Sequence, residues 1–124
     1  MADNTYTTLE AIHSRAQFND EAAVKRVVRR MLDKYGYFSF MPPANAYGKS
    51  GISDVLALGN GRFIAIECKF KYNKPTPMQL TFGKDVEDAG GMFVVVNEKN
   101  LVITMNRVIH FLTYGVDLGD DAEF

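Results

Sequence analysis

The sequence has a single cysteine, no tryptophan and almost no net charge over its 124 residues. The lone Cys68 excludes an internal disulfide and a zinc site built from several cysteines, and it is typical of a reducing compartment. No apolar run approaches the ~18 residues of a membrane-spanning helix, and the N-terminal residues lack the apolar stretch of a secretory signal. These absences predict a cytoplasmic protein that does not enter a membrane.

The charge balance limits the kinds of partner that can be inferred. The chain carries 14 Lys and Arg against 15 Asp and Glu, so its net charge of −1 creates no overall cationic field for nucleic acid. A local basic patch remains compatible with that balance. Hydrophobic residues make up 47% of the chain, which at this length is enough for one packed core. We therefore expect one α/β or α+β domain.

Hydrophobic periodicity predicts a long helix near the N-terminus. Apolar side chains recur at i, i+3, i+4, i+7, i+8 and i+11, namely Val24, Val27, Val28, Met31, Leu32 and Tyr35. Asn19 or Asp20 fits the N-cap, and Gly36 ends the helix. Residues 1–18 show no clear period. They fit either a short helical turn around Leu9 or an N-terminal arm that packs on a partner.

Strands and helices alternate through the rest of the chain. We predict strands over 37–40, 52–58, 62–70 and 92–96, a helix over 77–89, an edge strand over 101–104 and a last helix over 107–113. The segment Gly-Asn-Gly at 59–61 is a tight turn that joins two strands into a hairpin. The expected fold is α/β, with an αβββαβ core whose central mixed sheet is flanked by helices. This domain would cover 19–114, and an acidic tail would follow over 115–124.

Three charged residues lie in the most apolar part of the sequence, the predicted hairpin. Side chains alternate along a strand, so Glu67 and Lys69 share a face, and counting back from the turn puts Asp54 nearly opposite Glu67. Two adjacent carboxylates repel, and a divalent cation relieves that repulsion. With the Cys68 carbonyl they would form the hard-oxygen site that Mg²⁺ prefers. The same charges also fit a buried salt-bridge network, which the spacing alone favours.

The strings SGISDVLAL and FIAIECKFKYNKPTPMQ resemble the VRR-NUC branch of the PD-(D/E)XK nuclease superfamily. That branch has a G-x-P-D motif, an E-x-K motif on the next strand, and a Gln that opens the following helix. The chain has Gly51 to Asp54, with Ser53 in place of proline, then Glu67 to Lys69, then Gln79. The resemblance covers about residues 21–97, and with the element order it favours the nuclease interpretation over the salt-bridge network.

The resemblance implies a restriction-endonuclease-like fold and a DNA endonuclease that depends on Mg²⁺ or Mn²⁺. It further implies a homodimer selective for branched DNA, such as Holliday junctions or flaps. The alternative is a catalytically inactive nuclease-fold module that holds DNA or a protein. The N-terminal arm and the predicted edge strand over 101–104, with the apolar helix after it, are the expected dimer surfaces.

The resemblance also implies a role for each motif residue. Asp54, Glu67 and the Cys68 carbonyl would bind the metal, and Lys69 would position the attacking water. Gln79 would assist them.

Two of the assignments have a structural alternative. The family's helix glutamate corresponds to Glu21, which lies on the apolar face of its helix and would support a second metal or the water network. Glu21 equally fits compensation of the helix dipole. Gln79 equally fits a capping box with Thr76.

Basic residues around the motifs are candidate DNA-phosphate contacts. The first helix has a basic face made by Lys25, Arg26, Arg29 and Arg30, of which we select Arg26 and Arg30. Lys49, Lys71 and Lys74 flank the motifs from loops and are stronger candidates. A solvated helix face is the alternative for the helical residues.

Overall fold

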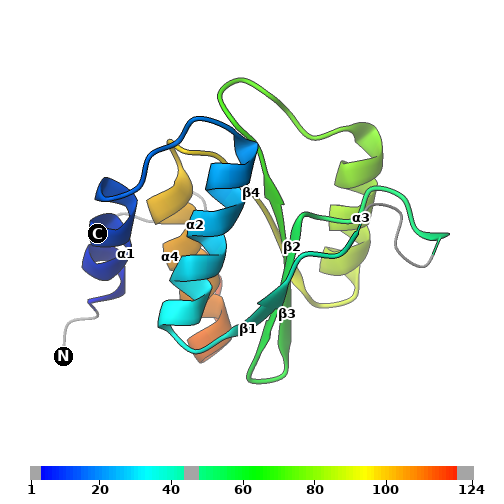
Figure 1. Cartoon of the computed structure of the whole chain (residues 1–124). Helices are drawn as coiled ribbons and strands as arrows, with labels where there is room; N and C mark the ends of the chain where they lie inside the picture. The colour runs from blue at the N-terminus through cyan, green and yellow to red at the C-terminus, as the bar shows by residue number, and fades with distance from the viewer. Residues whose placement is uncertain (1–3, 44–47, 120–124) are drawn as a thin grey trace.

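A four-stranded mixed sheet organises the chain (Figure 1). The computed structural model describes residues 4–43 and 48–119. Its strands are β1 (Phe38–Phe40), β2 (Val55–Gly59), β3 (Arg62–Cys68) and β4 (Met92–Val96), in the spatial order β1-β2-β3-β4. β1 and β2 pair antiparallel, as do β2 and β3, whereas β3 and β4 are parallel. The expected α/β class with a central mixed sheet is confirmed.

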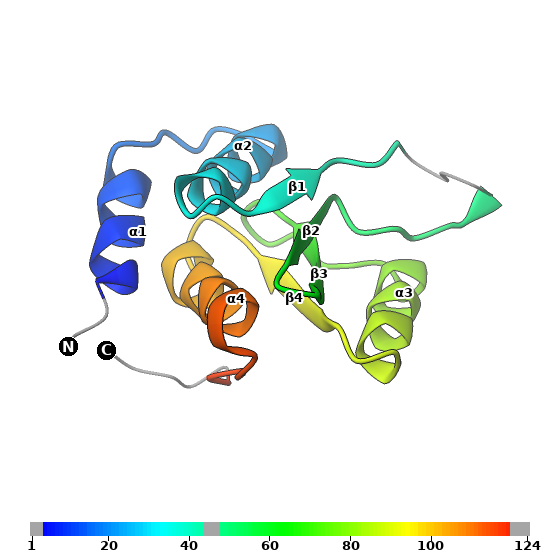
Figure 2. The ribbon, with the colours of Figure 1, turned by 90° about the horizontal axis from the view of Figure 1, so that it is seen from below.

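Helices cover both faces of the sheet. The described residues form α1 (Thr5–Ser14), α2 (Glu21–Lys34), α3 (Pro77–Asp88) and α4 (Leu101–Tyr114). Figure 2 shows α2 and α4 on one face, α3 on the other, and α1 outside α4. None of the helices in these residues is long and apolar enough to cross a bilayer.

Helix α2 forms as its sequence pattern predicts. The Asp20 carboxylate accepts a hydrogen bond from the Ala23 N–H at 2.9 Å, so Asp20 rather than Asn19 is the N-cap. The predicted apolar stripe is buried against the sheet, except that Tyr35 is only partly covered. Gly36 ends the helix at φ 74°, a left-handed conformation that favours glycine.

The predicted edge strand over 101–104 is wrong. These residues are the first turn of α4, which also absorbs the predicted short helix over 107–113. Leu101, Met105, Val108 and Leu112 are all fully buried, and their spacing of four, three and four residues is the helical period. The β-branched residues of the segment LVIT favour a strand only locally, and burial of the longer apolar stripe outweighs that preference.

The N-terminal segment is a helix that packs on its own chain. Leu9 of α1 is fully buried in the core shared with α2 and α4, and the His13 imidazole lies 2.7 Å from the Glu98 carbonyl oxygen. At the other end, the Arg107 guanidinium lies 3.2 Å from the Asp117 carboxylate. The last part of the predicted acidic tail, residues 120–124, lies outside the described residues.

Two apolar cores lie on opposite faces of the sheet. The larger is formed with α1, α2 and α4, and the smaller, around Leu56, Ala65 and Val86, lies under α3. Because side chains alternate along β3, Ala65 and Glu67 face α3 while Ile66 and Cys68 face α2 and α4. Both faces of β3 are therefore buried, and a charged residue at its end is withdrawn from water.

Candidate active site

The hairpin brings the predicted carboxylates together. Val55 pairs with Ile66 in the antiparallel register, so Asp54 and Glu67 occupy the next position along the two strands. This is the end of the sheet away from the hairpin turn, at the top of Figure 1, where α2 also begins. Turn position and strand register alone therefore placed these two residues correctly.

The Glu67 carboxylate is buried without adequate hydrogen bonding. Its side chain is 0% exposed, and neither carboxylate oxygen has a hydrogen-bond partner. The Lys69 ammonium forms an ion pair with it at 3.2 Å. Burial first, and then the nearby Asp54 carboxyl, raise the pKa of Glu67 to about 8, although Lys69 acts in the opposite direction. The site therefore favours a proton on Glu67 or a cation beside it.

Asp54 joins the end of β3 to α2. One of its oxygens accepts a hydrogen bond from the Cys68 N–H at 2.8 Å, and the other lies 3.4 Å from the Lys25 ammonium. An extended residue directs its N–H and C=O toward the same neighbouring strand, so the Cys68 carbonyl also lies on the Asp54 side of β3. The Cys68 thiol lies in the opposite core, where burial raises its pKa. Only the main chain of Cys68 is thus available to the carboxylates.

Lys25 lies directly beside the candidate site, whereas the sequence analysis placed it only in the basic face of α2, as a candidate contact to DNA phosphate or a solvated residue. Its ammonium lies between Asp54 and Glu21, at 3.4 and 3.9 Å. Burial alone would lower the pKa of Lys25, but the Asp54 carboxylate outweighs this and raises it. The sequence feature that could have indicated this position is the spacing of four residues between Glu21 and Lys25, but such pairs are common on helices.

Glu21 and Gln79 take the positions that their structural alternatives predict. Glu21 is in the first turn of α2 and is connected to Asp54 through Lys25. The Gln79 side-chain oxygen accepts from the Thr76 N–H at 2.9 Å, and the Thr76 hydroxyl accepts from the Gln79 N–H at 3.2 Å. This reciprocal capping box fixes the start of α3, so the Gln79 oxygen is already engaged.

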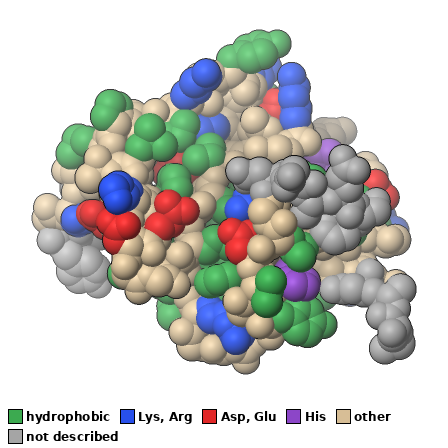
Figure 3. Space-filling model, turned by 180° about the vertical axis from the view of Figure 1, so that it is seen from behind, with side chains coloured by type: hydrophobic (Ala, Val, Ile, Leu, Met, Phe, Trp, Pro, Cys, Tyr) green, Lys and Arg blue, Asp and Glu red, His purple; other side chains and the backbone are tan. Residues whose placement is uncertain are grey.

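The candidate DNA contacts fall into three groups. Lys71 and Lys74 are exposed in the loop that follows Glu67 and Lys69, and basic side chains gather at that end of the molecule in Figure 3. Lys49 lies against α3, with its ammonium 3.7 Å from the Asp85 carboxylate.

Arg26 and Arg30 lie elsewhere. They line a groove of about 490 Å³ between α2 and β1. Arg29, which we did not select, binds the hydroxyl and carbonyl oxygens of Ser39 at 3.4 and 3.3 Å and so fixes one side of this groove.

The ligand set suits a hard cation but is small. In residues 4–43 and 48–119, no three Asp, Glu, His or Cys side chains form a metal-binding group. The available donors are two carboxylates and one main-chain carbonyl, which leave room for water, as Mg²⁺ prefers. The two Glu67 oxygens without hydrogen bonds are the observation that fits a cation. No protein-family model matches this chain, and no curated protein sequence matches it.

Proposed function

We propose that this protein is a DNA endonuclease that depends on Mg²⁺ or Mn²⁺ and hydrolyses phosphodiester bonds, preferentially in branched DNA. The observation that carries the proposal is the Glu67 carboxylate, which is fully buried beside Asp54, forms an ion pair among the described residues only with Lys69, and has no hydrogen bond of good geometry on either oxygen. A structural salt bridge would be expected to satisfy each buried oxygen, because an unpaired one is costly. Strongly shifted carboxyl groups of this kind cluster at functional sites.

The arrangement of elements supports the same proposal. Asp54 precedes β2, while Glu67, Cys68 and Lys69 end β3, and α2, β1, β2, β3, α3 and β4 follow one another along the chain. This is the element order expected of a restriction-endonuclease-like core of the VRR-NUC type. One part of the site reaches the surface, because the Asp54 side chain is 19% exposed.

Each residue then has a chemical role. Asp54, Glu67 and the Cys68 carbonyl would hold the cation, which stabilises negative charge on phosphoryl oxygens when bound. Lys69, whose side chain is only 11% exposed, holds its ammonium beside Glu67 and would orient the attacking water.

The neighbouring residues would act on charge and position. Lys25 would neutralise Asp54 when no cation is bound, and Glu21 lies 3.9 Å from the Lys25 ammonium on the same helix. Gln79 would assist through its amide nitrogen, because its oxygen caps α3.

The rival function is a nuclease fold that binds DNA or protein without cutting. The test is cleavage of supercoiled plasmid and of a panel of flaps and four-way junctions, in Mg²⁺, Mn²⁺ and EDTA. We expect cleavage only with metal. Asp54→Ala and Glu67→Ala should lose both cleavage and Mn²⁺ binding in calorimetry, whereas Lys69→Ala should lose cleavage alone.

The controls separate a specific loss from a general one. Lys69→Arg should not restore cleavage, since a guanidinium is wider and is a poor proton acceptor. Lys84→Ala removes an exposed lysine that pairs with Asp88 on α3, and it should cut normally. Equal Mn²⁺ binding by wild type and both carboxylate variants would refute the metal site.

A homodimer is part of the proposal, because two sites related by a two-fold axis match the symmetry of a branched substrate. The surfaces expected from the sequence are used within the chain, since 101–104 is helical and α1 covers α4. The exposed apolar side chains Phe38, Phe40 and Leu58, on β1 and β2 at the sheet edge, are the alternative surface.

A further inference from the structure

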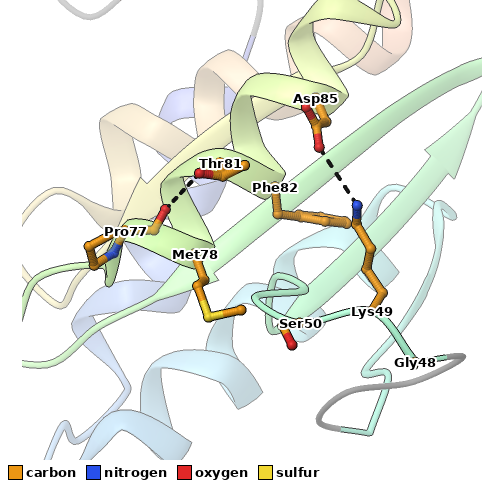
Figure 4. A pocket seen from close by; sticks show the side chains of 8 residues that line it. All are labelled: Gly48, Lys49, Ser50, Pro77, Met78, Thr81, Phe82 and Asp85. Carbon is orange, nitrogen blue, oxygen red and sulfur yellow. Dashed lines mark hydrogen bonds and ion pairs between the residues drawn. The ribbon is translucent and has the colours of Figure 1, made fainter.

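A pocket of about 360 Å³ lies between α3 and the loop that leads to β2 (Figure 4). Lys49 and Ser50 line it from the loop, and Met78, Phe82 and Asp85 line it from α3. Its volume is at the low end of small-molecule pockets, about 300–1,000 Å³, so it suits one flat ring system rather than a folded partner. None of these residues except Lys49 is used by the proposed active site.

The walls of the pocket combine an aromatic ring with polar groups at the rim. Phe82 is partly buried and packs against the core under α3, and in Figure 4 its ring extends toward Lys49. Met78 also lines the pocket, and its side chain is 55% exposed, so it is accessible to a ligand. The Lys49 and Asp85 side chains, 3.7 Å apart, are 55% and 57% exposed, so their ion pair is weak and both groups are available to a ligand.

A short segment of chain connects the pocket to the Asp54 carboxylate. Gly51 packs so closely on α3 that a Cβ there would lie 2.4 Å from the Met78 carbonyl oxygen, and its φ is +75°. Four residues then lead from Ser50 to Asp54, a reach of at most roughly 14 Å. A DNA strand that meets Asp54 and Glu67 therefore has its neighbouring nucleotides within reach of the pocket.

We propose that this pocket binds one unpaired nucleobase of the DNA strand held in the active site. Phe82 stacks on the base, Lys49 contacts its phosphate, and Asp85 accepts a hydrogen bond from its exocyclic amino group. A base inside a duplex cannot enter such a pocket, because it is paired and stacked. The pocket thus selects a flap or a junction with open bases, and in this respect the inference rests on the proposed function.

The test measures DNA binding in EDTA, so that cleavage plays no part. A flap oligonucleotide carries the fluorescent base analogue 2-aminopurine at each unpaired position in turn, and a matched series carries an abasic site there. At one position we expect a change in 2-aminopurine emission, and about tenfold weaker binding of the abasic flap. Phe82→Leu should abolish both effects, Phe82→Tyr should retain them, and Lys49→Met should weaken binding of every flap.

Leu80→Ala is the matched control, since Leu80 is exposed on α3 but does not line the pocket. The abasic series needs no variant, so a misfolded Phe82→Leu would not obscure the result. Equal binding of abasic and intact flaps at every position, or no DNA binding at all, would overturn the pocket. Base-dependent binding without cleavage in Mg²⁺ or Mn²⁺ would refute the endonuclease activity but not the base-binding pocket. Cleavage without base dependence would refute the base-binding pocket but not the endonuclease activity.

Discussion

The raised pKa of Glu67 results from its burial and from the Asp54 carboxyl group that lies beside it at the end of the sheet. β3 buries its carboxylate, the hairpin sets Asp54 beside it, and α2 delivers Lys25 to Asp54. Lys69 supplies the second cation. Lys25 and Lys69 each lie beside a carboxyl group of this cluster, yet both Glu67 oxygens lack hydrogen bonds. A buried carboxyl group without hydrogen bonds is a costly arrangement, and this makes the cluster responsive to pH and to cations.

Glu67 should make the metal-free protein less stable as the pH rises. The pKa of Glu67 is about 8 in the fold, against an ordinary value of 4.5. Below 4.5 both the folded and unfolded states hold the proton; between 4.5 and about 8 only the folded state does. Its contribution to the free energy of unfolding therefore falls across that window, by roughly 1 kcal/mol per pH unit at most.

Denaturant unfolding in EDTA at pH 5, 6.5 and 8 measures this fall. Glu67→Gln cannot titrate and should remove the fall, so the variant should be more stable than wild type at pH 8. Glu87→Gln on the exposed face of α3 is the control for loss of one negative charge. Parallel pH profiles for wild type and Glu67→Gln would contradict the raised pKa.

At the scale of a single element, the first turn of helix α3 is both a structural contact and part of the candidate site. Its capping box sets where the helix begins, and Gly51 packs directly on its first turn. The same turn carries Gln79, which is therefore both a structural residue and a candidate site residue. The two roles are separable, because glutamate also satisfies a capping box.

Gln79→Ala should lower the free energy of unfolding by about 1 kcal/mol, the usual net value of one hydrogen bond. Gln79→Glu should retain wild-type stability but cut DNA more slowly, since it lacks the amide donor and adds a negative charge. Thermal melts and cleavage rates measure the two effects. Thr76→Ser keeps the hydroxyl cap and is the control. A wild-type cleavage rate for Gln79→Glu would restrict Gln79 to capping.

At the scale of the whole molecule, exposed aromatic side chains lie next to each other on the edge strand β1. Phe38 is 63% exposed, and its ring lies 5.8 Å from that of Phe40 on the same face of β1. β1 is an edge strand of only three residues, so its outer side is unpaired within the sheet. Short edge strands limit unwanted pairing, but adjacent exposed aromatic rings are a recurrent feature of interfaces.

We expect light scattering at low micromolar concentration to report a dimer. Phe38→Lys should shift it to a monomer with little change in the melting temperature of the isolated chain, because the side chain is mostly exposed. Val116→Lys replaces another exposed apolar residue, outside β1, and should remain dimeric. A monomeric wild type that cuts linear and branched DNA equally well would remove the dimer and leave the metal chemistry intact.

The sequence by itself determined the features that depend on local period and turn geometry. The apolar stripe of α2, the strand Met92–Val96 and the hairpin turn were all predictable, and so was the convergence of Asp54 and Glu67. Each follows from spacing within a few residues or from the register that a tight turn imposes. The capping box of Gln79 was visible for the same reason.

Only the tertiary structure decided which distant groups meet. The local sequence of residues 101–104 favours a strand. A helix forms instead because it buries the whole apolar stripe of α4 in the core. Leu9 and Ile12 are too few apolar residues to predict a ten-residue helix from spacing, and packing against the larger core places them. Lys25 reaches Asp54, 29 residues away in sequence, because α2 begins beside that end of the sheet. Such contacts depend on how the helices and strands pack together, and the spacing of residues within one segment does not determine that packing.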